Sequence, residues 1–431
     1  MDKETNLVEK LNHENVDIRL ESLEKLAIII KEGKLPIPEK GNDVNNHIHT
    51  TYSFSPYSPS KAIWMAYNSG LMTAGIMDHD SISGALEFIE AGKILGMATT
   101  IGVECRADFS NTPLKGRKIN NPDQDTIAYV ALHGIPHTKI NEVQKFFIPY
   151  TRERNKRNKL MVNKINKLLE PFNIIVDFEK DVIPASKSNE GGSITERHIL
   201  FALSHKLVER FGKGHEVVDF LKEKLKINVK PTLREYLMDT TNQFYEYDLL
   251  GVLKSDLVDK IYVDATEECP QIDELVGFSN SIGAISAYAY LGDVTDSVTG
   301  DKKAQKFEDD YIDLLFQVLK DIGFNAVTYM PSRNTMGQLK KVKFLCQEYG
   351  LFQISGEDIN SPRQSFVCIA MRNEEFKNLV ESTWALIGHE KVATEDINKA
   401  MFSKETIVRY PDLDTRIRVY KEIGLNRSRT Q

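Results

Sequence analysis

The sequence predicts an α/β barrel, and three features of residues 45–104 indicate it. Short apolar runs at 71–77 and 98–103 have the length and composition of buried strands. The stretches 59–69 and 83–95 carry apolar residues at helical spacing. Clusters of ionisable residues follow the apolar runs. Because the side chains that follow successive strands of a barrel meet at one mouth, this order is typical of an α/β barrel that carries a site there.

The composition is that of a soluble globular protein with a large core. The chain has 431 residues, of which 41% are hydrophobic and 27% charged, enough for two or three domains or for one barrel with insertions. Its 55 basic and 62 acidic residues give a formal net charge of −7. A nucleic-acid partner is therefore not expected, although a local basic patch remains compatible with this balance.

The chain ends and the cysteines indicate a cytoplasmic protein. Residues 1–5 are polar and lack the apolar core of a signal peptide, and no uncharged apolar stretch is long enough to span a bilayer. The cysteines are scattered without close pairs, which predicts reduced thiols and neither a disulfide framework nor a zinc knuckle: Cys105, Cys269, Cys346 and Cys368.

Metal-ligand residue types gather after the first three predicted strands. His47 and His49 are two residues apart, so an extended chain presents both imidazoles on one face. Asp78, His79 and Glu104 would add donors at the same rim. Imidazole with carboxylate suits zinc, manganese or iron. The alternative is that the two histidines are ordinary surface or capping residues.

Three parts are expected along the chain. Residues 1–38 are predicted as a helical extension that either packs on the outside of the barrel or serves as a partner-binding arm. Residues 39–372 would form the barrel, with a mostly helical cap inserted at about 140–275. Residues 373–431 read as a charged, helical C-terminal extension.

The cap carries candidate phosphate ligands. A basic helix at 150–169 has an apolar side and a cationic side, and we expect Arg152 or Arg154 to contact a phosphate. A second helix is predicted to begin near Thr195. In its first turn Arg197 and His198 could bind or protonate a phosphate oxygen, because a helix N-terminus favours anions. His198 could instead cap or pack.

Further strands are predicted at 126–132, 282–291, 326–329 and 351–355. His133 follows the first of them and could approach the metals or remain a hydrogen-bonded loop residue. Arg333 is either a phosphate contact or part of a surface ion pair. Asp358 follows the last strand, where a charge is costly unless it is paired or metal-bound. Arg363 could contact this cluster or the substrate.

Three motifs in the first part of the chain resemble the polymerase and histidinol phosphatase (PHP) family of metal-dependent phosphoesterases: His47-Ile-His49-Thr, Asp78-His79-Asp80-Ser81-Ile-Ser-Gly84 and Gly102-Val103-Glu104. Later segments are similar, in order, to the phosphatase branch: Arg152-Glu-Arg154-Asn155, Ile194-Thr-Glu-Arg197-His198-Ile199, Gly323-Phe-Asn-Ala-Val and Gly356-Glu357-Asp358-Ile359-Asn360. The resemblance spans about residues 44–367.

The resemblance implies a distorted (β/α)7 barrel with an inserted cap. It assigns the metal ligands as His47, His49, Asp78, His79, Glu104 and Asp358. The family's aspartate after the first motif is missing, since Phe54 follows Ser53. Three family histidines are replaced, by Tyr129, Tyr290 and Asn360. Because tyrosine and asparagine are poor substitutes for imidazole, one or two divalent ions (Mn, Zn or Fe) are expected in place of a full trinuclear set.

The function implied is hydrolysis of a phosphate monoester of a nucleotide or small metabolite by metal-activated water. In that interpretation His79, His198 and Asp78 are catalytic, and the substrate-binding residues are Arg197, Arg152, Arg154, Arg333 and Arg363. Two alternatives remain: a catalytically impaired barrel that binds a metabolite or regulates, and a nuclease acting on nucleic-acid ends. The oligomeric state is not predicted.

Overall fold

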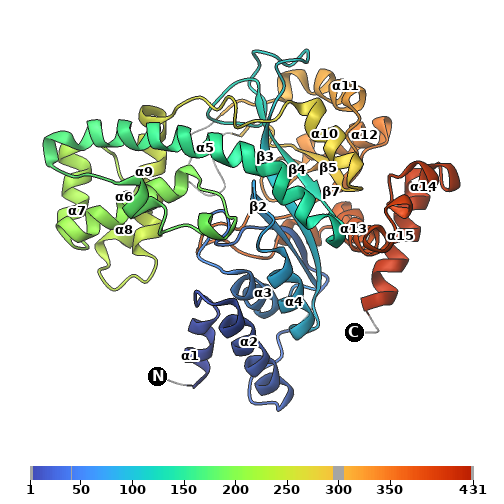
Figure 1. Ribbon diagram of the computed structural model, residues 1–431, viewed down its shortest axis with the longest axis horizontal. Helices are drawn as coiled ribbons and strands as arrows, with labels where there is room; N and C mark the ends of the chain where they lie inside the picture. The colour runs from blue at the N-terminus through green and yellow to red at the C-terminus, as the bar shows by residue number, and fades with distance from the viewer. Residues whose placement is uncertain (1–2, 40, 295–304, 429–431) are drawn as a thin grey trace.

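Seven strands form one curled sheet in which neighbours follow chain order, β1 to β7 (Figure 1). This computed structural model describes residues 3–39, 41–294 and 305–428. The strands are β1 (Val44–Ile48), β2 (Thr73–His79), β3 (Ala98–Asp108), β4 (Ile127–His133), β5 (Ile285–Ala289), β6 (Ala326–Thr328) and β7 (Phe352–Ile354). The prediction of a mixed α/β fold with a barrel-like sheet is confirmed.

All neighbouring strands are parallel except β4, which is antiparallel to both β3 and β5. Since β4 runs in reverse, its last residue does not reach the mouth where the other strands end. His133 pairs with Gly102, two residues below Glu104, and is only 1% exposed. His133 therefore does not reach the mouth from a strand end as expected, although burial and the charge of His47 lower the pKa of its imidazole to about 3.

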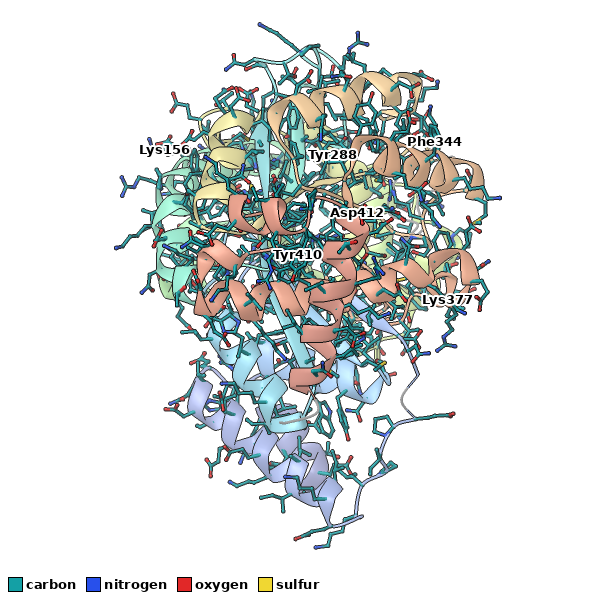
Figure 2. The ribbon with its side chains drawn as sticks, turned by 90° about the vertical axis from the view of Figure 1, so that its right-hand side faces the viewer. Lys156, Tyr288, Phe344, Lys377, Tyr410 and Asp412 are labelled. Atoms are coloured by element: carbon teal, nitrogen blue, oxygen red, sulfur yellow. The ribbon has the colours of Figure 1, made fainter. Side chains whose placement is uncertain are left out.

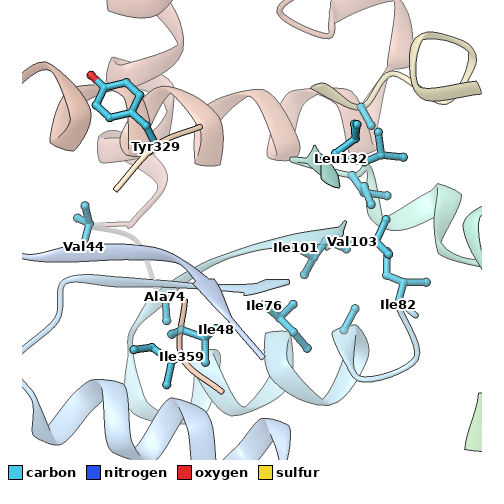
Figure 3. Packing of buried hydrophobic residues seen from close by; sticks show 14 of the residues in the cluster. Val44, Ile48, Ala74, Ile76, Ile82, Ile101, Val103, Leu132, Tyr329 and Ile359 are labelled. Atoms are coloured by element: carbon cyan, nitrogen blue, oxygen red, sulfur yellow. The ribbon is translucent and has the colours of Figure 1, made fainter. Parts of the chain in front are cut away.

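The two edges of the sheet meet through the segment that follows β7. Ile48 and Ile359 form a parallel bridge, and they lie side by side in Figure 3. The His49 amide donates to the Ile359 carbonyl (2.9 Å), and the Ile359 amide donates to the His47 carbonyl (3.1 Å). Gly356 permits this approach, because a Cβ there would lie 2.7 Å from the backbone nitrogen of His47.

Helices cover the outer face of the sheet and bury its apolar side chains (Figure 3). Ile76 of β2, Val103 of β3 and Phe88 of a covering helix belong to one continuous core. The covering helices are α3 (Pro59–Asn68), α4 (Ala85–Leu95), α10 (Ile272–Ser281), α11 (Ile312–Ile322) and α12 (Met336–Tyr349). The N-terminal helices α1 (Lys3–Lys10) and α2 (Val16–Lys31) pack against this layer. Arg19 of α2 is buried there and donates to both carboxylate oxygens of Glu87.

The inner face of the sheet is filled by the C-terminal part of the chain. Ala385 and Leu386 of α13 (Lys377–Glu395) pack against inward-facing residues such as Ala287 and Phe352. Figure 2 shows these C-terminal helices in front of the sheet. The remaining two are α14 (Lys404–Arg409) and α15 (Leu413–Ser428). Residues 373–431, expected as an extension, thus contribute a helix to the core.

The cap has an apolar core of its own, drawn in green at the left of Figure 1. Its helices are α5 (Ile140–Leu169), α6 (Glu196–Phe211), α7 (His215–Asp219), α8 (Pro231–Met238) and α9 (Tyr245–Ile261). Phe54, in the loop after β1, joins this core and so connects the cap to the barrel mouth.

The cysteines and the helix lengths bear on two further expectations. All four cysteines are buried and form no disulfide. Among the described residues, no helix combines the length and apolar character that a membrane crossing requires.

We expect Gly356→Ala to open the junction between β1 and the segment after β7. The added methyl group would meet the His47 backbone, which cannot move without breaking the bridge to Ile359. Thermal unfolding should shift down by several degrees. Gly251→Ala in α9 is the matched control, because its Cβ would meet no atom within 4 Å and should leave the midpoint unchanged or slightly raised. Equal midpoints for both variants would contradict this account of the junction.

Candidate metal centre

An irregularity in β1 sets the direction of the first two candidate ligands. Between Asn45 and Ile48, β1 has one residue more than the paired part of β2, as in a β-bulge. Ile48 therefore stays in the outer core while His47 faces inward toward Glu104. His47 Nε2 and His49 Nε2 lie 3.2 Å apart. The prediction that the two imidazoles lie together is confirmed.

Three buried side chains make a compact ligand set. His47, His49 and Glu104 each offer one ligand atom, and these atoms lie within 4.8 Å of one another. His47 and Glu104 are 9% and 7% exposed, and His49 is 1% exposed. Two imidazole nitrogens and a carboxylate at this spacing could together coordinate a divalent ion.

Two further predicted donors border this set. His79 Nδ1 lies 3.1 Å from Glu104 Oε2, and His49 Nε2 lies 3.2 Å from Asp358 Oδ1. The ring centroids of His49 and His79 are 4.6 Å apart. The structure therefore brings together five of the six expected ligands, from β1, β2, β3 and the segment after β7.

The polar atoms here fit a cation. His79 Nδ1 is buried, and although it faces Glu104 it makes no hydrogen bond within the described part of the chain. Burial disfavours a charge on His47, but the carboxylates of Glu104, Asp358 and Glu357 outweigh burial and raise the pKa of its imidazole. A buried nitrogen without a hydrogen-bond partner, beside an excess of carboxylates, would be satisfied by a metal ion.

Asp78 lies on the other side of β2. Since side chains alternate along a strand, Asp78 points away from His79 and Glu104. Its Oδ1 accepts from the Thr50 amide (2.7 Å) and from Ser53 Oγ (2.6 Å), and its Oδ2 accepts from Thr50 Oγ1 (2.6 Å). Ser53 Oγ is also 3.2 Å from His49 Nδ1. The geometry places Asp78 behind His49, where it orients the loop after β1.

The three residues expected to stand in place of metal-binding histidines have other contacts. Tyr290 Oη donates to Asp309 (2.6 Å), and Asn360 Nδ2 donates to Asp358 Oδ1 (2.7 Å). The ring of Tyr129 lies 5.9 Å from that of His79.

Arg197 is the candidate substrate ligand whose charge acts on one of the metal donors, Asp358. It belongs to the first turn of α6, and no ion pair within 4 Å holds it among the residues described. Partial burial would raise the pKa of Asp358. The hydrogen bond with His49 and the charges of His47 and Arg197 together hold that pKa well below its usual range.

Arg154 is instead part of a buried network that joins the cap to the barrel. It pairs with Asp80, and its side chain is 3% exposed. Two further arginines and two glutamates complete the network, with three positive and three negative side chains in all: Arg106, Arg157, Glu196 and Glu268. Removing one partner would leave a buried charge uncompensated.

The other three arginines lie away from the triad. Arg363 makes a two-pronged contact with Asp248 of α9 (2.6 and 2.7 Å) and stacks on Tyr236. Arg333 Nε donates to the Leu291 carbonyl (3.2 Å). Arg152 is exposed on α5 and borders a cavity on the outer side of the loop after β2.

His198 caps its own helix. Its Nδ1 accepts from the Thr195 amide (3.0 Å), so a neutral ring carries its proton on Nε2. Burial, with the nearby charge of Arg154, lowers the pKa of His198 to about 3. The ring is therefore suited to donating a hydrogen bond and poorly suited to delivering a proton at neutral pH.

Sequence reasoning did not single out Ser53, Arg106 or Glu268. The sequence position of Arg106 does indicate its direction, because it lies two residues after Glu104 and so shares the inward face of β3. The position of Glu268 gives no such indication, because its loop reaches the network only through the folded cap. Ser53 was noted only as the residue before Phe54.

His49→Ala and Glu104→Gln should each strongly reduce the content of transition metal that copurifies with the protein. Each change removes a donor from the buried triad, and metal affinity should fall at least about tenfold. Elemental analysis and chelator competition measure both quantities. The surface substitution His205→Ala is the control, since its side chain is 56% exposed. Full metal content in both triad variants would contradict this site.

No protein-family model and no curated protein matches this chain. Two solved structures have a distantly similar fold. A proposed metal-dependent phosphoesterase from Bifidobacterium adolescentis has 17% identity and a TM-score of 0.49, covering 78% of this chain and 96% of its own. An amidohydrolase from Chromobacterium violaceum, with bound sulfate and no metal, has 16% identity and a TM-score of 0.48, covering 75% and 90%. These similarities are too distant to support an argument about the site.

Proposed function

We propose that this protein is a metal-dependent hydrolase of the PHP type that cleaves phosphate monoesters of small metabolites. The observation that carries the proposal is the buried set of His47, His49 and Glu104, with the charge of Arg197 acting on the adjoining Asp358. Two imidazoles and a carboxylate can hold a divalent ion, and an arginine without an ion pair can bind the anionic group of an ester.

In this proposal His47, His49 and Glu104 hold one divalent ion (Mn, Zn or Fe), and His79 and Asp358 contribute to it or to a second. A bound ion would lower the pKa of a coordinated water and offset charge on the phosphoryl oxygens. Asp78 and Ser53 fix the ring of His49 from behind, in the manner of residues that orient metal ligands.

Arg197 would bind the phosphate of the substrate. Its guanidinium can donate two parallel hydrogen bonds to phosphate oxygens, and its place in the first turn of α6 adds the free amides of a helix N-terminus. The leaving oxygen would draw its proton from solvent, because burial lowers the pKa of both His198 and His79 and leaves the two rings neutral.

A second candidate, a metabolite-binding module without turnover, is favoured by one observation. Tyr290, at the position of a family ligand, hydrogen-bonds to Asp309 and offers no metal donor. A nuclease fits less well, because nucleic-acid binding requires accessible positive charge. The net charge is −7, and the arginines of the buried network are already paired with carboxylates.

We expect phosphate release from at least one ester in a panel of phosphorylated metabolites assayed with added Mn²⁺ or Zn²⁺. Glu104→Gln should lower kcat by at least about a hundredfold, because it removes a ligand of the ion. Arg197→Gln should raise KM about tenfold or more, and Arg197→Lys should recover part of that loss because it restores the charge without the fork.

Wild-type protein that binds metal and metabolite yet releases no phosphate would contradict the hydrolase and support the binding module. Turnover that survives Glu104→Gln unchanged would place the catalytic centre elsewhere.

A further inference from the structure

A second cavity lies on the cap side of the loop that follows β2. It encloses about 660 Å³ between α5, the loop of Asp80 to Ser83, and residues 188–192. None of the five converged metal donors lines it. Its volume lies within the range of cavities that hold small organic ligands.

The cavity wall on α5 is cationic. Arg152, Lys156 and Lys159 line it and recur at helical spacing, so they lie on one face of the helix. The two lysines pair with Glu153 and Glu179, and Lys159 also lies over the ring of Phe178 (5.3 Å to its centroid); ion pairs this accessible to solvent are weak. No ion pair holds Arg152 within the described ranges 3–39, 41–294 and 305–428.

The carboxylates that line the cavity are already neutralised. Asp80 pairs with the buried Arg154, and Glu190 pairs with Lys187 (2.6 Å). Lys156 and Lys159 are paired in the same way with Glu153 and Glu179, so Arg152 supplies the excess of positive charge in the cavity, which an anionic group would satisfy.

Part of the lining is apolar. Ile148 is 54% exposed, although it is a large aliphatic residue, and Ile82 and Phe147 are buried beneath the same surface. The cavity therefore combines a solvent-exposed apolar side chain with the cations of α5. This combination fits a ligand that has both an anionic group and an apolar body.

We propose that this cavity is a binding site for a small organic anion, distinct from the metal centre. The anionic group contacts Arg152 and Lys156, and the apolar body packs on Ile148. Asp80 separates the two sites. It follows His79 directly, has a left-handed backbone (φ 49°) and donates its amide to the Glu104 carbonyl (2.8 Å). This second site does not depend on the proposed phosphatase activity.

The test is isothermal titration of the full-length protein with 1-naphthylphosphonate, whose carbon–phosphorus bond a phosphoesterase does not cleave. We expect a dissociation constant below about 1 mM for wild type. Inorganic phosphate should bind at least about tenfold more weakly, because it lacks the apolar body. The double variant Arg152→Glu with Lys156→Glu should weaken binding of the naphthylphosphonate at least about tenfold.

Two controls give the test its specificity. Lys145→Glu reverses a charge on the same helix outside the cavity lining and should bind as wild type does. His49→Ala disables the metal triad and should also retain binding. Absence of binding to wild type, or unchanged binding in the double variant, would overturn the proposal. Binding lost in His49→Ala but kept in the double variant would place the ligand at the metal centre and overturn it too.

Discussion

The contact between Ile48 and Ile359 is the constraint on which the candidate centre depends. It joins the first strand of the sheet to the segment after the last one through two backbone hydrogen bonds. That junction brings Asp358 Oδ1 to within 3.2 Å of His49 Nε2, although more than three hundred residues separate them in the chain. The close approach at Gly356 shows how tightly the junction is packed.

Charge balance differs between the two sides of the loop after β2. On the inner side, carboxylates exceed what the neighbouring side chains neutralise, and the pKa of His47 rises in response. On the outer side, Asp80 belongs to a buried network of ion pairs that contains three arginines. Because that network spans β2, β3, α5 and α6, it holds the cap in a fixed position over the barrel mouth. Under the proposed function, Arg154 would stay in this network and Arg197 would be the cap residue that binds the substrate.

The sequence allowed the centre to be predicted where local rules apply. The proximity of imidazoles two residues apart, and the position of Glu104 at the end of an apolar run, follow from strand alternation. The bulge in β1 that turns His47 inward does not. The same alternation also separates Asp78 from His79, so the outward direction of Asp78 could have been read from the strand. The pattern of α5 predicts one apolar and one cationic side, but nothing local distinguishes Arg152, which is exposed, from Arg154, which is buried.

Other features depend on contacts between distant segments. The reversal of β4 is invisible in its own apolar pattern, and it is what keeps His133 below the level of Glu104. Likewise, the mixed composition of α13 gives no sign that Ala385 and Leu386 fill the inside of the sheet. Pairing direction and helix docking are decided by the whole fold, which is why sequence patterns predicted the elements better than their arrangement.

The most direct measurement is an anomalous-difference map from crystals of the protein grown with Mn²⁺ or Zn²⁺. The account predicts a peak about 2.0–2.3 Å from the inward-facing nitrogens of His47 and His49 and from a Glu104 oxygen. A map with no peak among these three side chains, or with its strongest peak elsewhere on the molecule, would contradict the central claim.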